Sequence, residues 1–273
     1  MNPWPQGWRR RTAVMGVINI TPDSFSDGGR FLNSDKAISQ ADRLISQGAD
    51  VLDLGAQSTR PGADDVGSEE ECRRLIAPLR QIRQQHPNTI LSVDTYRADV
   101  AEAALSAGAN WINDVSGGQR DPSMLSVMAS AGCPVVLMHS RGDSKTMDDL
   151  TDYDDVVNDV LAGLRSRTEA AMAAGVMPNQ IVWDPGLGFA KNVEQNLGLL
   201  RGLERLNSDG FPLLLGPSRK RFIGAVLNEP RPQARIWGTA AVACRCAQAG
   251  VAIVRVHDVR PMAQTLKMAA SLW

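Results

Sequence analysis

The feature that most constrains this chain is a recurring unit: a helical segment, a glycine, a short apolar run and then a polar residue. Residues 47–55, 107–114, 131–139 and 249–257 are four clear copies of it. The glycine suits the left-handed position just past a helix C-terminus. The apolar runs are nearly continuous, which is typical of strands in a parallel sheet covered on both faces. Strands that alternate with helices in this way predict βαβ crossovers.

Eight such apolar runs can be counted, and eight strands with helices between them favour a closed barrel over an open sheet. The length of 273 residues is close to the roughly 250 that one (β/α)₈ barrel takes. Because no linker or low-complexity segment divides the chain, we predict an α/β fold, a single-domain (β/α)₈ TIM barrel over residues 12–273 after an N-terminal arm over residues 1–11. The expected strands lie near residues 12–18, 50–54, 90–93, 111–113, 134–138, 181–183, 212–216 and 252–256.

The start of one predicted helix carries a specific signal. Ser68 and Glu71 have the spacing of a capping box, in which each side chain bonds the backbone N–H of the other.

Composition narrows the possible partners and locations. The formal net charge is -1, so we expect neither a nucleic-acid nor a membrane-surface partner. The apolar runs are too short to span a bilayer, and the first residues lack the apolar segment of a signal peptide. We therefore predict a cytoplasmic protein. The four cysteines show no zinc-site spacing and are expected to pack as small apolar side chains.

Polar side chains follow the predicted strands, and each one alone has an ordinary structural explanation. Asp53 can simply bond neighbouring backbone, Asp94 can cap a helix, and Asn113 can bridge two strands. His139 can be a buried histidine with its hydrogen bonds satisfied, and His257 can cap the last helix.

Together these residues indicate a site, because the carboxyl ends of all barrel strands meet on one face. The middle strands would bring acidic and amide groups to that face, and the last strands would bring Lys220, Arg255 and His257. Carboxylates recognise an amidine-like N–C–N edge by paired hydrogen bonds. The basic half would suit phosphate. Nucleotide-binding glycine motifs, a serine-hydrolase elbow and a zincin motif are absent from the sequence, so those chemistries are not supported.

From residue 12 to its end, the chain resembles the dihydropteroate synthase family. Several long stretches carry the resemblance, in the family's order. They are MGVINITPDSFSDGG at 15–29, STRPGA at 58–63, SVDT at 92–95, INDVSGG at 112–118, LMH at 137–139, DPGLGFAKN at 184–192, SRK at 218–220 and RVHDV at 255–259.

The resemblance implies a transferase of folate biosynthesis that forms a C–N bond. Such an enzyme condenses 6-hydroxymethyl-7,8-dihydropterin pyrophosphate with p-aminobenzoate to give 7,8-dihydropteroate and pyrophosphate. It also implies a (β/α)₈ barrel, Mg²⁺ as cofactor, a homodimer, and competition between sulfonamides and p-aminobenzoate. Mg²⁺ often keeps waters and takes substrate phosphates as ligands, so a single amide ligand from the protein is chemically reasonable.

The site residues that the resemblance implies fall into groups by role. The pterin ring would be bound by Thr59, Asp94, Asn113, Met138, Asp184 and Lys220. The pyrophosphate would be bound by Asn19, Arg255 and His257, with Asn19 also the protein ligand of Mg²⁺. The p-aminobenzoate side would be lined by Pro61, Phe189, Lys220 and Arg221. Residues in catalytic roles would be Asp27, Thr59, Arg60 and Lys220.

The chain departs from the family pattern in two places. The family often has serine after the SRK lysine, where this chain has Arg221. The second loop commonly reads Gly-Gly-Glu-Ser-Thr-Arg-Pro, whereas this chain has Ala56 and Gln57 before Ser58.

Two other functions fit the same barrel. A pterin-binding methyltransferase would share the acid–amide pterin cluster but has no pyrophosphate to hold, so the basic half argues against it. A non-catalytic pterin-binding homologue would have lost Asn19, Asp27, Thr59 or Lys220, and this chain keeps them all.

Overall fold

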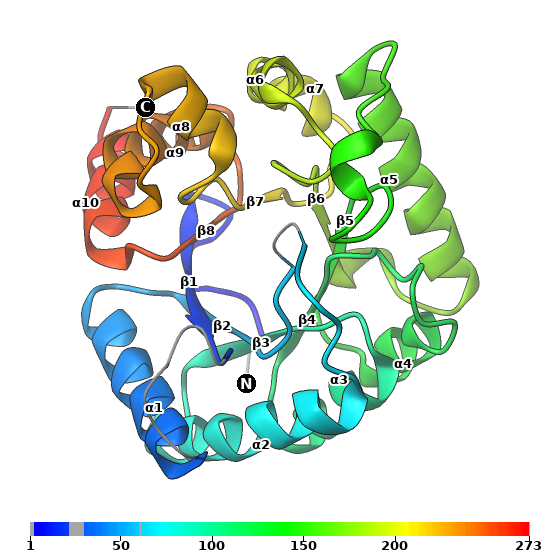
Figure 1. Ribbon diagram of the computed structural model, residues 1–273, viewed down its shortest axis with the longest axis vertical. Coiled ribbons are helices and arrows are strands. Elements are labelled where there is room, and N and C mark those ends of the chain that lie inside the picture. Colours follow the sequence, from blue (N-terminus) through cyan, green and yellow to red (C-terminus); the bar gives the residue numbers. More distant parts are fainter. Residues whose placement is uncertain (1–2, 22–29, 60–61, 273) are drawn as a thin grey trace.

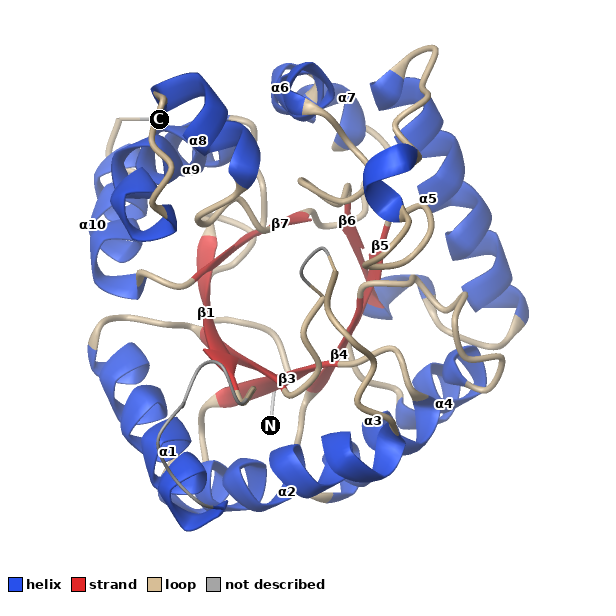
Figure 2. Cartoon of the chain, in the orientation of Figure 1, coloured by secondary structure: helices blue, strands red, loops and turns tan. Residues whose placement is uncertain are grey.

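Eight parallel strands form one sheet that curls into a barrel, with the helices around its outside (Figures 1 and 2). The computed structural model describes residues 3–21, 30–59 and 62–272, and the side chains of residues 30–33 are not described. The strand order is β6-β5-β4-β3-β2-β1-β8-β7. The strands are β1 (Ala13–Asn19), β2 (Val51–Gly55), β3 (Ile90–Asp94), β4 (Trp111–Asp114), β5 (Val135–Met138), β6 (Ile181–Asp184), β7 (Leu214–Leu215) and β8 (Ile253–Val256).

The barrel closes between its first and last strands and again beside β7. β1 pairs in parallel with both β2 and β8. The seam between β6 and β7 is held by a parallel bridge between Trp183 and Leu213, next to a 2.9 Å hydrogen bond from the Trp183 N–H to the Pro212 carbonyl. The predicted (β/α)₈ barrel and the positions of its eight strands are therefore confirmed.

Helices fill the connections between strands, and two connections contain a second, short helix. The longer helices are α1 (Arg30–Ser46), α2 (Ser68–Gln85), α3 (Ala98–Ser106), α4 (Met124–Ala131), α5 (Val156–Ala173), α6 (Val193–Arg201), α9 (Ile236–Gln248) and α10 (Val259–Ala269). The short ones are α7 (Leu203–Leu206) and α8 (Arg221–Leu227), which lie before β7 and after it. None of the helices in the described part of the chain has the length and apolar character needed to cross a membrane.

The predicted capping box at the start of α2 is wrong. The residue that precedes the helix is Gly67, and no side chain caps the helix there. The Ser68 hydroxyl donates to Asp99 instead, and Glu71 is fully buried and pairs with Arg97. Ser68 and Glu71 therefore do not cap each other. Ser68 binds α3, and Glu71 binds the loop before α3.

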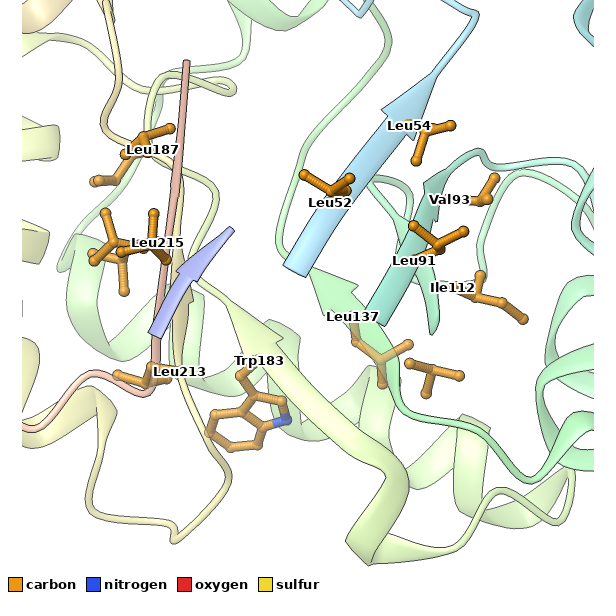
Figure 3. Close-up of a cluster of buried hydrophobic side chains, with 14 of the residues drawn as sticks. Leu52, Leu54, Leu91, Val93, Ile112, Leu137, Trp183, Leu187, Leu213 and Leu215 are labelled. Carbon is orange, nitrogen blue, oxygen red and sulfur yellow. The ribbon is translucent and has the colours of Figure 1, made fainter. Parts of the chain in front are cut away.

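The main core lies between the sheet and the helices. Every second side chain of a strand points outward into this layer, as do Leu52 and Leu54 of β2 and Leu91 and Val93 of β3 (Figure 3). The remaining side chains point into the barrel, where all but Asn19 and Arg255 are also buried. Burial on both faces is why the strands appear as continuous apolar runs in the sequence.

Inside the barrel, the side chains change from apolar to polar along the strands. A second apolar cluster fills the end at which the strands begin. It consists of Ala13, Met15, Val51, Ile90, Trp111, Val136, Val182, Leu214, Ala252 and Ile253. Two residues further along, several inward positions become polar, as at Asp53, Asn113, Asp184 and Arg255, and these form part of the site described below.

The N-terminal arm covers the apolar end of the barrel. Trp4 stacks on Trp8 with their ring centroids 4.6 Å apart, and it meets the buried Trp111 edge-on at 5.0 Å. The Trp111 indole N–H donates to the Pro3 carbonyl at 2.5 Å. Arg11 joins the arm to the barrel wall through a 2.9 Å hydrogen bond to Asp50.

We expect Trp4→Ala to lower the free energy of unfolding by about 2 kcal/mol, because it removes the ring that packs on both Trp8 and Trp111 at this end of the barrel. The kcat should stay unchanged, since the arm lies at the opposite end from the polar layer. Urea unfolding and a steady-state assay measure the two effects. Met177→Ala, at a side chain that is 60% exposed, is the control and should leave stability unchanged. A Trp4 variant as stable as the wild type would show that the arm does not contribute to folding.

Candidate active site

The polar layer is formed by inward-facing residues near the carboxyl ends of the strands. Residues i and i+2 of a strand share a face, so the same alternation that places Met15 and Val51 inside the barrel also directs the later residues inward. Register pairs Asp94 with Asn113 and Met138 with Asp184 on adjacent strands. The residues of this layer are Asn19, Asp53, Asp94, Asn113, Met138, Asp184 and Arg255.

Arg255 joins two carboxylates from different strands. Its Nε donates to Asp53 Oδ2 at 2.6 Å, and its Nη2 donates to Asp94 Oδ2 at 2.7 Å. Asn113 Nδ2 also donates to Asp53 Oδ2, at 3.0 Å. Arg255, which the sequence assigns to pyrophosphate, is therefore already held by Asp53 and Asp94. The planar fork of its guanidinium suits carboxylates.

The two carboxyl groups of the predicted pterin site have raised pKa values. Burial raises the pKa of Asp94, and the negative charge of Asp53 raises it further, while Arg255 opposes the change. Burial raises the pKa of Asp184 to about 6, although the Gly186 N–H donates to its Oδ1 at 2.7 Å. At neutral pH Asp184 is therefore mostly ionised and accepts hydrogen bonds.

Lys220 faces this layer from the loop between β7 and α8. Burial lowers the pKa of its ammonium to about 8, and the charge of Asp184 limits the change. Its Nζ lies 4.3 Å from the centroid of the Phe189 ring, within the range of a cation–π contact. Gly188 permits this approach, because a Cβ at that position would lie 2.9 Å from Lys220 Cδ.

The residue before Lys220 has a strained backbone that a salt bridge holds in place. Arg219 has φ of 62°, an uncommon value for a residue with a side chain. Its Nε and Nη2 bind both carboxylate oxygens of Asp258 at 3.0 and 2.8 Å. This pair joins the loop of Lys220 to the end of β8, where His257 Nδ1 lies 3.1 Å from the Ser218 hydroxyl.

Other predicted site residues lie further from the polar layer or outside the described residues. Arg221 is exposed and pairs with Asp148 at 2.5 Å. The predicted residues Asp27, Arg60 and Pro61 lie outside the described residues.

Thr59 lines a cavity of about 220 Å³ between the β2–α2 loop and the loops after β4 and β5. Phe189 also lines this cavity, so its ring stands between the cavity and Lys220. The β5–α5 loop holds the β2–α2 loop in place. The Gly62 N–H donates to the Ser144 carbonyl at 2.8 Å, and the Ser144 hydroxyl donates to the Ala63 carbonyl at 2.9 Å.

Gln57, one of the departures from the family pattern, closes the base of the β2–α2 loop. Its Nε2 donates to the carbonyls of Ser58 and Asp64 at 2.8 and 2.9 Å, and its Oε1 accepts from the Val66 N–H at 2.9 Å. An amide satisfies these three groups, since it both donates and accepts. An ionised carboxylate could not donate to the two carbonyls.

Asp53 and Lys191 are two buried groups whose roles the sequence reasoning missed. Lys191 Nζ donates to the carbonyls of Gly186 and Phe189 at 3.1 and 2.9 Å and lies 3.2 Å from His139 Nδ1. Burial lowers the pKa of Lys191 to about 7, and burial together with the charge of Lys191 lowers the pKa of His139 to about 2. His139 is therefore a neutral acceptor that helps to fix the loop carrying Phe189. Lys191 directly follows the apolar, glycine-rich stretch 185–190, and that position was its only signal in the sequence.

The chain matches known proteins over almost its whole length. The family described as "Pterin binding enzyme" matches residues 15–257. Dihydropteroate synthase of Synechocystis sp. is 50% identical over 266 residues, which cover 97% of this chain and 92% of that protein. Dihydropteroate synthase of Bacillus subtilis is 44% identical and covers 97% of this chain and 90% of that protein.

Solved structures similar in fold to this chain are also dihydropteroate synthases. Dihydropteroate synthase of Xanthomonas albilineans with 4-aminobenzoic acid superposes with a TM-score of 0.90 at 42% identity, over 96% of this chain and 93% of that one. The Clostridium difficile dihydropteroate synthase, determined with pteroic acid, gives a TM-score of 0.91 at 43% identity, over 98% of each chain. The chain therefore belongs to the dihydropteroate synthase family of pterin-binding enzymes.

Proposed function

We infer that this chain is a dihydropteroate synthase, which joins p-aminobenzoate to 6-hydroxymethyl-7,8-dihydropterin pyrophosphate and releases pyrophosphate. The observation that supports this most is the polar layer itself. Two buried carboxyl groups and one carboxamide face two cations, Lys220 and Arg255, at the carboxyl end of the barrel. The relatives with this fold include the Xanthomonas albilineans enzyme determined with 7,8-dihydropteroate.

We propose that the acidic side of the layer binds the pterin ring. Asp94, Asn113 and Asp184 offer oxygen acceptors to the N–H groups of the ring, and Met138 and Thr59 contact its faces and edge. Lys220 stays mostly protonated at neutral pH, because its pKa of about 8 lies above that pH. It therefore places a positive charge between the pterin and the Phe189 ring.

The reaction begins with the break of the C–O bond to pyrophosphate, whose oxygen keeps the electron pair. Arg255 and His257 hold the pyrophosphate, and Asp27 stabilises the cation left on the exocyclic methylene. The lone pair of the aniline nitrogen then forms the C–N bond, and the nitrogen loses its proton to solvent. Thr59, Arg60 and Pro61 keep water from the cation while p-aminobenzoate lies along Phe189 and Lys220, with its carboxylate toward Arg221.

The donor set fits Mg²⁺ held mainly by substrate. The described residues contain no group of three His, Cys, Asp or Glu side chains that could hold a metal ion. Asn19 ends β1 at the polar layer, and its amide oxygen is a ligand type that Mg²⁺ accepts. When bound there, Mg²⁺ would neutralise charge on the pyrophosphate. The predicted cytoplasmic location stays a prediction.

We expect the purified chain, given dihydropterin pyrophosphate and Mg²⁺, to release pyrophosphate only when p-aminobenzoate is present. Asn19→Ala and Lys220→Met should each lower kcat/KM by about 100-fold or more, the usual loss when a group that stabilises developing charge is removed. A coupled pyrophosphate assay measures this, with Lys267→Met, an exposed lysine, as the control. Tight pterin binding without turnover would instead identify a binding protein.

Sulfonamides should compete with p-aminobenzoate, because both present an aniline and an anionic end. The Yersinia pestis dihydropteroate synthase, 39% identical to this chain, has been determined in a sulfonamide complex. Initial rates should show a raised apparent KM for p-aminobenzoate and an unchanged kcat. Phe189→Ala should weaken both the aniline substrate and the sulfonamide. Inhibition that excess p-aminobenzoate does not relieve would contradict a shared site.

We also propose a homodimer formed through α8 and α9, which carry adjacent exposed apolar side chains. Trp237 is 79% exposed, and Val226 and Leu227 are 55% and 47% exposed. The two helices lie against each other, since a Cβ at Gly238 would lie 2.8 Å from Leu227 Cδ1. Exposed apolar patches of this kind often mark self-association, and a two-fold dimer would bury the same patch on both copies.

Trp237→Glu should convert the dimer to a monomer in sedimentation velocity, because it places a charge in the apolar interface. Met177→Glu, at an equally apolar but separate exposed position, is the control and should remain dimeric. A wild-type chain that is monomeric at micromolar concentration would refute the proposed interface.

A further inference from the structure

Asp53 is a buried carboxylate inside the barrel to which the reaction gives no part. Its side chain has no exposed area, and β2–β3 register pairs it with Ser92, two residues before Asp94. Along β2 and β3 it therefore lies two residues deeper in the barrel than Asp94. Its Oδ2 accepts from both Arg255 and Asn113, while its Oδ1 has no hydrogen-bond partner among the described residues.

Asp53 fixes which way the Asn113 carboxamide faces. A carboxamide has a donor edge and an acceptor edge that are nearly equal in shape, and only its hydrogen bonds decide between them. A carboxylate accepts and does not donate, so the Nδ2 of Asn113 must face Asp53 at 3.0 Å. The Oδ1 of Asn113 then points away from Asp53 and is available as an acceptor.

Asp53 also fixes Arg255, and through it Asp94. The guanidinium is planar, so holding its Nε against Asp53 sets the direction of the Nη2 that binds Asp94. Without Asp53, Arg255 would be free to turn away from Asp94 or to bind Asp94 with both arms of its fork. Either change would alter the acceptors that Asp94 presents.

We propose that Asp53 is a positioning residue that makes the pterin pocket an array of acceptors, by orienting the Asn113 carboxamide and by holding Arg255 against Asp94. The pocket then selects a heterocycle whose edge carries adjacent N–H donors, such as a 2-amino-4-oxo pyrimidine ring. This inference rests on the proposed function, because it concerns how the same site recognises its pterin.

Two variants of the full chain separate the hydrogen bonds of Asp53 from its charge. Asp53→Ala removes the oxygen that binds Asn113 and Arg255. It should weaken 6-hydroxymethylpterin binding by about 10- to 100-fold, the loss usual for partners that orient ligating side chains. Asp53→Asn keeps an oxygen for those bonds, so it should recover most of the affinity. Neither variant should change the KM for p-aminobenzoate more than about twofold, because Asp53 does not contact that substrate and substitutions without direct contact have small effects.

The pH profile of pterin binding gives a readout that a general loosening of the barrel would not change. Asp94 faces Asp53 from β2, Arg255 from β8, Asp114 from β4, Glu71 from α2 and Lys220 from the loop before α8. The negative charge of Asp53 raises the pKa of Asp94, so removing it lowers that pKa. Ionised carboxylates are the better acceptors, and affinity therefore rises with pH as Asp94 and Asp184 lose their protons. In both variants the midpoint of this rise should move to lower pH.

Isothermal titration calorimetry with 6-hydroxymethylpterin from pH 5 to 9 tests these expectations. The control is Asp50→Asn, since Asp50 also pairs with an arginine but lies at the other end of the barrel. Wild-type affinity in Asp53→Ala, equal losses in the Ala and Asn variants, or an unmoved pH midpoint would each overturn the proposal.

A measurement on the wild-type chain keeps the test open if the variants do not fold. Neutron diffraction from a D₂O-exchanged crystal should show the deuterated nitrogen of Asn113 facing Asp53, and an oxygen there would overturn the proposal. A wild-type chain that neither binds pterin nor releases pyrophosphate would refute the proposed function itself. An active wild type with an unaffected Asp53→Ala variant would refute only the role of Asp53.

Discussion

The rest of this structure depends on the period-two alternation of side chains along eight parallel strands. Each strand places every second residue inside the barrel, so the interior is built of successive layers. The first layers are apolar and include Met15, Val51 and Trp111. The last carries Asp94, Asn113 and Asp184. A shift of one residue in β3, β4 or β6 would move its polar group out among the helices, where the main core is apolar.

The polar layer is organised by charge as well as by position. Arg255 is shared by Asp53 and Asp94, and the charge of Asp184 acts on Lys220. Burial disfavours the charged forms of Asp94, Asp184 and Lys220, and the opposite charges nearby offset part of this effect. The dipoles and charges of the polar layer are therefore oriented before a ligand binds. Such preorganisation makes the electrostatic stabilisation of a transition state effective.

The sequence predicted the barrel and the polar ends of its strands, because both depend on local patterns: apolar runs, turn residues and family motifs. It did not predict partners that only the closed barrel brings together. Arg255 binds Asp53 and Asp94, which are 202 and 161 residues away in the chain. The same limit explains the failed capping box, since Glu71 turns inward to meet Arg97. Gln57 was noticed as a departure, but its three bonds to the loop backbone depend on how that loop folds back.

The seating of the N-terminal arm has a consequence for biosynthesis. Trp4 and Trp8 precede all eight strands in the chain, yet they pack against a cluster that includes Trp111, Ala252 and Ile253. β1 likewise needs β8 as its second neighbour. The arm can therefore reach its final place only after β8 has been synthesised, and until then its indole rings stay exposed to chaperones and to other nascent chains. Docking of the arm is thus a late event that reports completion of the barrel.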